Sequence, residues 1–79
     1  MSIFHNNFMK DSRNKILALN IKAERYRNGL TQSELAEKIN VSDSTISLIE
    51  RGLQTPSIFV IFDIAKVLKV DINDLLKNI

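Results

Sequence analysis

The feature that most restricts how this chain can fold is the position of its helix-breaking residues. Its 79 residues include two glycines and one proline, and none of the three interrupts a run of regularly spaced apolar residues. Gly29 and Gly52 each follow such a run, where a helix commonly ends on a residue in the left-handed conformation. The chain is therefore expected to be a series of helices that end at defined residues.

Residues that begin helices are equally clear. In the segment TQSE at residues 31–34, the threonine can cap a helix while the glutamate reaches back to it, which makes a capping box. Ser42, Ser57 and Asp71 are further expected caps, each with an aliphatic residue four positions later. Together these signals predict no strands and five helices, over residues 13–28, 32–39, 43–51, 58–68 and 72–78.

The length of the chain allows one domain, because chains usually divide only above about 250 residues. We expect residues 13–79 to form that domain and residues 1–12 to be an N-terminal extension. The extension contains apolar residues that could dock on the domain, but it could equally be a frayed tail.

Composition excludes several classes of function. There is no cysteine and only one histidine, so no disulfide framework, zinc site or base–nucleophile pair is expected. We expect no metal, no cofactor and no enzymatic activity. No apolar run approaches the roughly 20 residues that cross a membrane, and the N-terminus lacks the features of a signal peptide. The prediction is a soluble cytoplasmic protein with no membrane association and no small-molecule ligand.

Positive charge is concentrated in the first third of the chain. The net charge is only +2, yet residues 10–28 carry six basic and two acidic side chains, whereas the charges of residues 53–79 balance. One side of the molecule facing a polyanion would explain this asymmetry, although an ordinary solvated surface explains it as well.

The middle of the chain joins two short helices by a short turn. Residues 40–42 connect the helices expected over 32–39 and 43–51, and Asn40 stands where the turn needs a left-handed backbone. Ala36 is small where the two helices must approach each other. Aliphatic side chains at the spacing of a shared core are Leu35, Ile39, Val41, Ile46 and Ile49. The second and third helices are therefore predicted to form a helix-turn-helix.

The stretch TQSELAEKINVSDSTISLIERG resembles the helix-turn-helix of the lambda-repressor-like, Cro/XRE-type family of bacterial and phage regulators. The flanking segments IKAERYRNGLTQ and TPSIFVIFDIAKVLKVDINDLL resemble the other helices of that family, so the match covers about residues 14–77. The resemblance implies a compact all-α domain of five helices. It also implies sequence-specific binding of double-stranded DNA, usually as a dimer on a palindromic operator.

Matching the motif directs four residues of the third helix toward the bases of the major groove: Asp43, Ser44, Ser47 and Leu48. Serine hydroxyls can donate or accept at base edges, and Leu48 can contact a thymine methyl group. Asp43 either accepts from cytosine N4 or stabilises the N-terminus of its helix. Because no Gln, Asn, Lys or Arg occupies these positions, specificity is expected to be modest or to depend partly on DNA shape.

The resemblance also implies contacts away from the bases. The family residue at the position of Gln32 contacts a phosphate, although a solvated residue at the helix start is the alternative. Thr45 and Arg51 are candidates for the same role. Family members commonly pair the acidic residue of the I-E-R-G motif with an arginine of the first helix. Here that structural ion pair would be Glu50 with Arg25, and it would clamp the first helix to the third.

The helix expected over residues 58–68 has more apolar residues than one core requires. A single stripe at helical spacing contains Ile58, Ile61, Ile64, Ala65 and Leu68. Two phenylalanines lie beside that stripe, which suggests a subunit interface. The residues expected in this homodimer interface are Phe59, Phe62, Ile72, Leu76 and Ile79. The alternative is that residues 1–12 cover the same surface within one chain.

Two functions from different classes remain. The first is a sequence-specific transcriptional regulator that binds operator DNA as a dimer. The alternative is a helical protein-interaction module, antitoxin-like or anti-regulator, with weak or no reading of DNA. The weak set of base-reading side chains favours the alternative, whereas Gln32, Arg51 and the intact turn favour the regulator.

Overall fold

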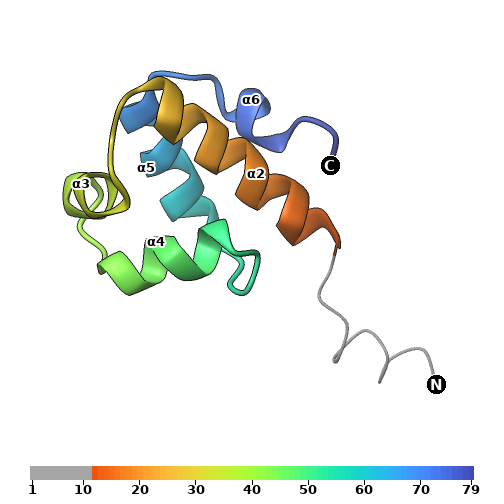
Figure 1. The fold of residues 1–79 in the computed structure, drawn as a ribbon. Coiled ribbons are helices and arrows are strands. Elements are labelled where there is room, and N and C mark those ends of the chain that lie inside the picture. The colour runs from red at the N-terminus through yellow and green to blue at the C-terminus, as the bar shows by residue number, and fades with distance from the viewer. Residues whose placement is uncertain (1–11) are drawn as a thin grey trace.

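The computed structural model describes residues 12–79, in which there are five helices and no strands (Figure 1). The helices are α2 (Ser12–Arg27), α3 (Gln32–Lys38), α4 (Asp43–Glu50), α5 (Ile58–Leu68) and α6 (Ile72–Leu76). The prediction of an all-α fold with five helices is confirmed, and each helix begins and ends within two residues of its expected bounds. The expected N-terminal extension lies almost entirely outside the described residues, so the division between residues 12 and 13 stays a prediction.

The largest difference from the expected bounds is near the C-terminus. α6 ends at Leu76, whereas the prediction extended that helix to residue 78. Lys77 has an extended backbone with φ −64° and ψ 145°, and Asn78 has a positive φ of 68°. Neither conformation continues a right-handed helix. The chain therefore leaves α6 early, and the side chain of Ile79 is exposed.

Three of the four connections between the described helices are built in the same way. Each has a residue in the left-handed conformation, then a partly buried aliphatic residue, then the cap of the next helix. These triplets are Gly29-Leu30-Thr31, Asn40-Val41-Ser42 and Lys69-Val70-Asp71. In each, the N–H of the aliphatic residue donates to the carbonyl oxygen five positions earlier, at 3.0 to 3.2 Å. One triplet thus ends a helix, adds an apolar side chain to the core and begins the next helix.

The expected left-handed residues and caps are present. Gly29, Asn40 and Gly52 have φ values of 67°, 61° and 74°, which confirms the prediction for all three. The capping box of residues 31–34 is also confirmed, with both reciprocal hydrogen bonds formed. Lys69 has a φ of 60° as well, although neither glycine nor asparagine marks that position in the sequence.

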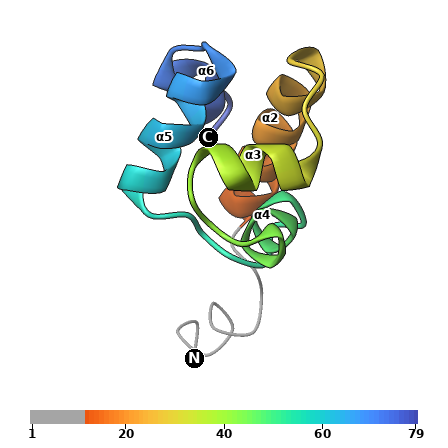
Figure 2. The ribbon, with the colours of Figure 1, turned by 90° about the vertical axis from the view of Figure 1, so that its left-hand side faces the viewer.

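The five helices enclose one apolar core. α2 and α5 stand on opposite sides of the molecule in Figure 2, and α4 lies along the lower edge in both views (Figures 1 and 2). Ala36 is fully buried in the core, where its small side chain suits the close packing of α3 and α4, as predicted. The buried apolar residues of this cluster are Leu17, Ile21, Leu35, Ala36, Ile46, Ile49, Ile61, Ile64, Ala65, Leu68 and Leu75.

One residue of the expected stripe on α5 is not part of the core. Ile58 is 53% exposed, so its assignment to the buried stripe was wrong. Ile58 is the first residue of α5, directly after the cap Ser57, and the core begins one turn later at Ile61. The other members of the stripe are buried as predicted. Ile58 instead adds to the exposed apolar side chains of α5.

The backbone of Lys69 provides a test of the connection between α5 and α6. An L-residue in the left-handed conformation costs about 1–2 kcal/mol, and glycine avoids this strain while losing about 0.5–1 kcal/mol through its greater chain entropy. We expect Lys69→Gly to raise the free energy of unfolding by up to about 1 kcal/mol, measured by urea denaturation. Lys66→Gly, inside α5, is the matched control and should lower it by about 1 kcal/mol. If Lys69→Gly and Lys66→Gly lowered the free energy of unfolding equally, the backbone of Lys69 would not be strained.

Candidate nucleic-acid interface

α4 presents one polar face to solvent. Ser42 caps the helix, with its Oγ accepting from the N–H of Thr45 at 3.1 Å. Ile46 and Ile49 lie three positions apart and are both buried, which places them on the side of α4 that faces the core. The opposite side then carries Asp43, Ser44, Ser47 and Leu48, of which the first two are exposed and the last two half-buried.

These four side chains meet two others at a shallow depression of about 420 Å³. Its lining residues are Gln32, Asp43, Ser44, Ser47, Leu48 and Arg51. The structure thus brings together all four residues expected to face bases and two of the three expected to contact phosphates. Thr45 is not among the lining residues, and its hydroxyl lies 2.9 Å from the hydroxyl of its own cap, Ser42.

Asp43 has a partner within the chain. Its carboxylate accepts a hydrogen bond from the hydroxyl of Ser33, which belongs to α3. The bond joins the first turn of α3 to the first turn of α4 and uses one of the two carboxylate oxygens of Asp43. Sequence reasoning missed Ser33, because nothing in its local pattern shows that it faces the next helix.

Arg25 and Glu50 form a buried ion pair between α2 and α4. The guanidinium donates from Nε to Oε2 at 2.7 Å and from Nη2 to Oε1 at 2.9 Å. The side chains are only 6% and 1% exposed. Two parallel hydrogen bonds between a guanidinium and a carboxylate are strong and fix the relative orientation of the two groups. These contacts hold α2 and α4 together at the position that the family motif indicated.

The same carboxylate also holds the start of α3. Gln32 donates from Nε2 to Oε1 of Glu50 at 3.1 Å, and Arg25 donates from Nη1 to the carbonyl oxygen of Leu30 at 2.8 Å. Three helices therefore meet at Glu50. The sequence predicted the ion pair but not the attachment of Gln32, whose amide keeps a second N–H and a carbonyl oxygen for other contacts.

The surroundings of Arg25 stabilise its charge. The hydrogen bond to Glu50 raises the pKa of the Arg25 guanidinium above its already high ordinary value, although burial acts in the opposite direction. The guanidinium also lies 4.6 Å from the centroid of the Tyr26 ring, a cation–π contact. In residues 12–79 no buried side-chain nitrogen or oxygen lacks a hydrogen-bond partner. The network is therefore fully satisfied despite its burial.

The residues expected in a subunit interface lie on α5, on α6 and at the C-terminus. Phe59 is 76% exposed and Phe62 is 55% exposed. Leu76 and Ile79 are also exposed, at 37% and 47%. Ile72 differs, since it is partly buried and packs against the core at the first position of α6. We call the four exposed residues, together with Ile58, the α5–α6 apolar surface.

Two other kinds of feature are absent from the part of the chain that the structure describes. No group of three or more His, Cys, Asp or Glu side chains there is arranged to hold a metal ion. None of its helices is both long enough and apolar enough to cross a bilayer.

Comparison with known proteins gives consistent matches. The model of a family described as helix-turn-helix matches residues 21–75. The chain is 44% identical over 55 residues to an uncharacterized HTH-type transcriptional regulator of Methanocaldococcus jannaschii, covering 70% of this chain and 83% of that protein. It is 47% identical over 57 residues to the HTH-type transcriptional regulator SinR of Bacillus subtilis, covering 71% of this chain and 51% of SinR. The chain thus spans about half the length of SinR.

Solved structures agree with these matches. The clp gene regulator ClgR from Corynebacterium glutamicum has a TM-score of 0.80 at 26% identity, covering 86% of this chain and 72% of that one. SinR, described as the master regulator for biofilm formation, was crystallised in complex with DNA. That structure has a TM-score of 0.73 at 42% identity, covering 77% of this chain and 98% of that one. A SinR–SinI protein complex has a TM-score of 0.74 at 41% identity, covering 78% of this chain and 61% of that one.

The ion pair makes a testable contribution to stability. Glu50→Ala leaves a buried arginine unpaired, and such a loss costs about 3–5 kcal/mol. The double change Arg25→Met with Glu50→Leu should cost less, because no charge is left buried. Urea denaturation of the wild type, Arg25→Met, Glu50→Leu and the double variant gives the coupling free energy.

A second carboxylate serves as the control for that experiment. Glu24 pairs with Arg27 one turn away on the same helix, and the Arg27 side chain is 62% exposed. The Glu24 side chain is only 9% exposed, but its partner is largely in water and glutamine keeps its size and an accepting oxygen. Glu24→Gln should therefore lower the free energy of unfolding by no more than about 1 kcal/mol. A coupling free energy of zero between Arg25 and Glu50 would contradict a structural role for their pair.

Proposed function

The chain belongs to the helix-turn-helix family of transcriptional regulators, and we propose that it regulates transcription by binding specific sequences of duplex DNA as a homodimer. The family binds DNA and is not enzymatic, in agreement with the expectation that the chain is not an enzyme. The observation that carries the proposal is the meeting of Gln32, Arg51 and the polar face of α4 at one depression.

The dimensions of α4 suit the major groove. A helix with its side chains is about 10–12 Å across, and the major groove of B-DNA is about 12 Å wide. With the exposed face of α4 toward the bases, Gln32 and Arg51, which line the same depression, would each reach a backbone phosphate beside the helix. Glu50 already holds Gln32 in place, so little conformational freedom would be lost on binding. The crystal structure of SinR in complex with DNA, at 42% identity, supports DNA as the ligand.

Reading of the bases would depend mainly on Ser44, Ser47 and Leu48. Asp43 is bonded to Ser33 and brings negative charge toward the phosphates, so we assign it chiefly to the start of α4. The remaining side chains cannot make the two-bond contacts that discriminate strongly between bases. Because one protein chain would discriminate only modestly between bases, we propose that two chains bind one operator.

The α5–α6 apolar surface is the proposed dimer contact. α5 and α6 lie beside and above α4 in Figure 2, so a partner on that surface would leave the exposed face of α4 open. A two-fold dimer on one face of the duplex would place its recognition helices about 34 Å apart, which corresponds to a palindromic operator.

A second candidate function is a protein-interaction module that reads DNA weakly. Two observations favour it: the exposed aromatic side chains of α5, and the solved structure of SinR, at 41% identity, in a complex with the SinI protein. The salt dependence of DNA binding distinguishes the two functions. A regulator should bind duplex DNA with an affinity that falls steeply as salt rises, because only phosphate neutralisation produces a steep slope of log affinity against log salt.

The proposed docking of α4 predicts different effects for two phosphate contacts. Arg51→Ala should weaken binding to all duplex sequences and lower the salt slope by ~1, because one cation is lost. Gln32→Ala should weaken binding with little change in slope, since an amide carries no charge. Fluorescence anisotropy at several salt concentrations measures both quantities, with Lys66→Ala on α5 as the control. An unchanged slope for Arg51→Ala would show that α4 docks differently.

Leu48 is expected to contact a thymine methyl group. Replacing thymine by uracil removes that methyl and leaves base pairing intact. At one position of a duplex selected by the wild type, the replacement should weaken binding about fourfold, as expected for about 0.8 kcal/mol per buried methyl-sized group. Leu48→Ala should bind both duplexes equally. If every thymine can be replaced without effect on the wild type, Leu48 does not read a methyl group.

The dimer is tested at Phe59. Phe59→Asp places a charge without a partner in an apolar contact, so the variant should be a monomer and should lose operator binding. It should remain folded, because Phe59 lies outside the core. Sedimentation equilibrium of both proteins, with circular dichroism for folding, is the measurement. A wild type that stays monomeric at ~100 μM would exclude the dimer, since an association of ~8 kcal/mol saturates far below that concentration.

A further inference from the structure

The first turn of α2 is attached to the loop that follows α4. The hydroxyl of Thr55 donates to Oδ1 of Asn14 at 2.8 Å. Gly52 packs directly against Lys15, so closely that a Cβ added at Gly52 would lie 3.3 Å from Cγ and 3.5 Å from Cα of Lys15. Gly52 is therefore needed both for its left-handed backbone and for this close approach. As a result, Lys15 is held beside the C-terminal end of α4.

Lys15 and Arg51 share a second depression, of about 310 Å³. Its other lining residues are Ala18, Leu19 and Glu50. Lys15 and Arg51 are both exposed, and in the part of the chain that the structure describes neither forms an ion pair with an acidic side chain. Glu50, the acidic group of the lining, is neutralised by Arg25. The depression therefore carries two positive charges without opposing negative charge.

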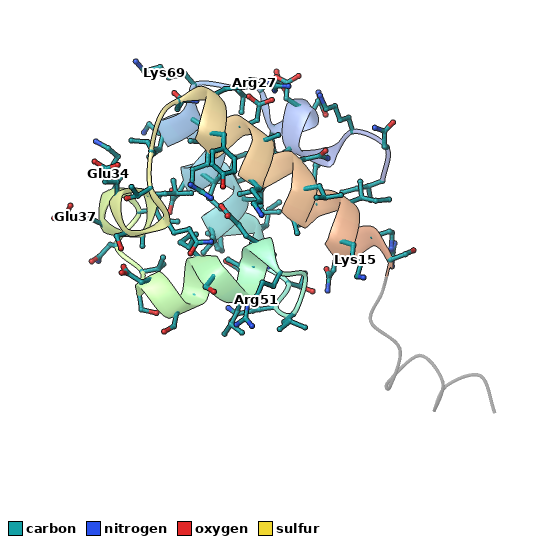
Figure 3. All side chains as sticks on the ribbon, in the orientation of Figure 1. Lys15, Arg27, Glu34, Glu37, Arg51 and Lys69 are labelled. Carbon is teal, nitrogen blue, oxygen red and sulfur yellow. The ribbon has the colours of Figure 1, made fainter. Side chains whose placement is uncertain are left out.

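The two cations lie on the same side of the molecule as α4. In Figure 3 Arg51 lies at the lower edge beside the C-terminal end of α4, and Lys15 lies to its right at the start of α2, whereas the acidic side chains of Glu34 and Glu37 project from α3 on the left. A long hydrogen bond of 3.4 Å from Nε of Arg51 to the carbonyl oxygen of Ser47 keeps its guanidinium along α4. The positive charges of Lys15 and Arg51 thus lie near the C-terminal end of α4, where DNA bound to the exposed face of that helix would pass.

From this arrangement we infer that Lys15 and Arg51 together bind one backbone phosphate of duplex DNA at the C-terminal end of α4. The inference rests on the proposed function and adds the first turn of α2 to the DNA interface. The depression suits a sugar–phosphate group, since Leu19, which is 66% exposed, offers an apolar wall beside the two cations.

The test compares two lysines of one helix. Lys22 is exposed, like Lys15, and lies seven residues or about 10 Å further along α2, so Lys22→Gln makes the same change of charge away from α4. Lys15→Gln should lower the salt slope by about 0.9, equivalent to roughly eightfold weaker binding at 0.1 M salt if affinity at 1 M is unchanged. Lys22→Gln should leave the slope and affinity at the wild-type values. Circular dichroism should be identical for all three proteins.

A second experiment locates the contact on the DNA. Duplexes in which a single phosphate is replaced by a neutral methylphosphonate are titrated with each protein. One such replacement should weaken wild-type binding but have little further effect on Lys15→Gln or on Arg51→Gln. Inorganic phosphate at constant ionic strength should not displace DNA from the wild type, because the site requires the sugar–phosphate chain. Displacement by millimolar phosphate from the wild type but not from Lys15→Gln would instead identify a site for free anions.

The outcomes separate this inference from the proposed function. If Lys15→Gln behaves like Lys22→Gln while Arg51→Ala still lowers the slope, the Lys15 contact is wrong and the docking of α4 stands. The proposed function fails together with the inference in two cases. In the first, no variant changes the salt-dependent affinity for duplex DNA. In the second, the wild type has no salt-dependent affinity for duplex DNA.

Discussion

The arrangement of the proposed DNA-binding surface depends on the buried ion pair of Arg25 and Glu50. One carboxylate receives the guanidinium from α2 and the amide of Gln32 from α3, and it is itself part of α4. Groups held away from water in this way cannot separate without leaving a buried charge unpaired, which is costly. The position of Gln32 relative to the exposed face of α4 is therefore set before any ligand binds.

The connections between helices explain why so short a chain can hold this geometry. Each repeated triplet combines a left-handed residue, an apolar side chain directed to the core and a helix cap. A turn with these three properties leaves little freedom for the path between helices, because its backbone hydrogen bonds and its burial must both be satisfied. Asn40, Val41 and Ser42 thereby bring α3 and α4 to the spacing at which Ala36 fits.

The two exposed surfaces differ in chemistry, and the proposed assembly uses both. The face of α4 carries hydroxyl groups and one leucine, with cations at its C-terminal end, which suits contact with a polyanion but gives little discrimination between bases. The α5–α6 apolar surface exposes large apolar side chains, among them two phenylalanines, and favours association with another apolar surface. Pairing two weakly discriminating faces through the second surface is how a domain of this size would gain specificity.

The sequence by itself determined the helices, their caps, the left-handed residues at Gly29, Asn40 and Gly52, and the helix-turn-helix. These features depend on interactions within about five residues, so local pattern is sufficient to find them. The partner of Glu50 came from the resemblance to a known family.

Only the tertiary structure decided which distant side chains meet. The bond of Gln32 to Glu50 spans 18 residues and that of Ser33 to Asp43 spans 10, and the contact of Lys15 with Gly52 joins the first turn of α2 to the loop after α4. Such contacts depend on the angles at which helices cross, and these angles result from the packing of the whole core. The exposure of Ile58 has the same origin, because helical spacing defines a stripe but not the turn at which the core begins.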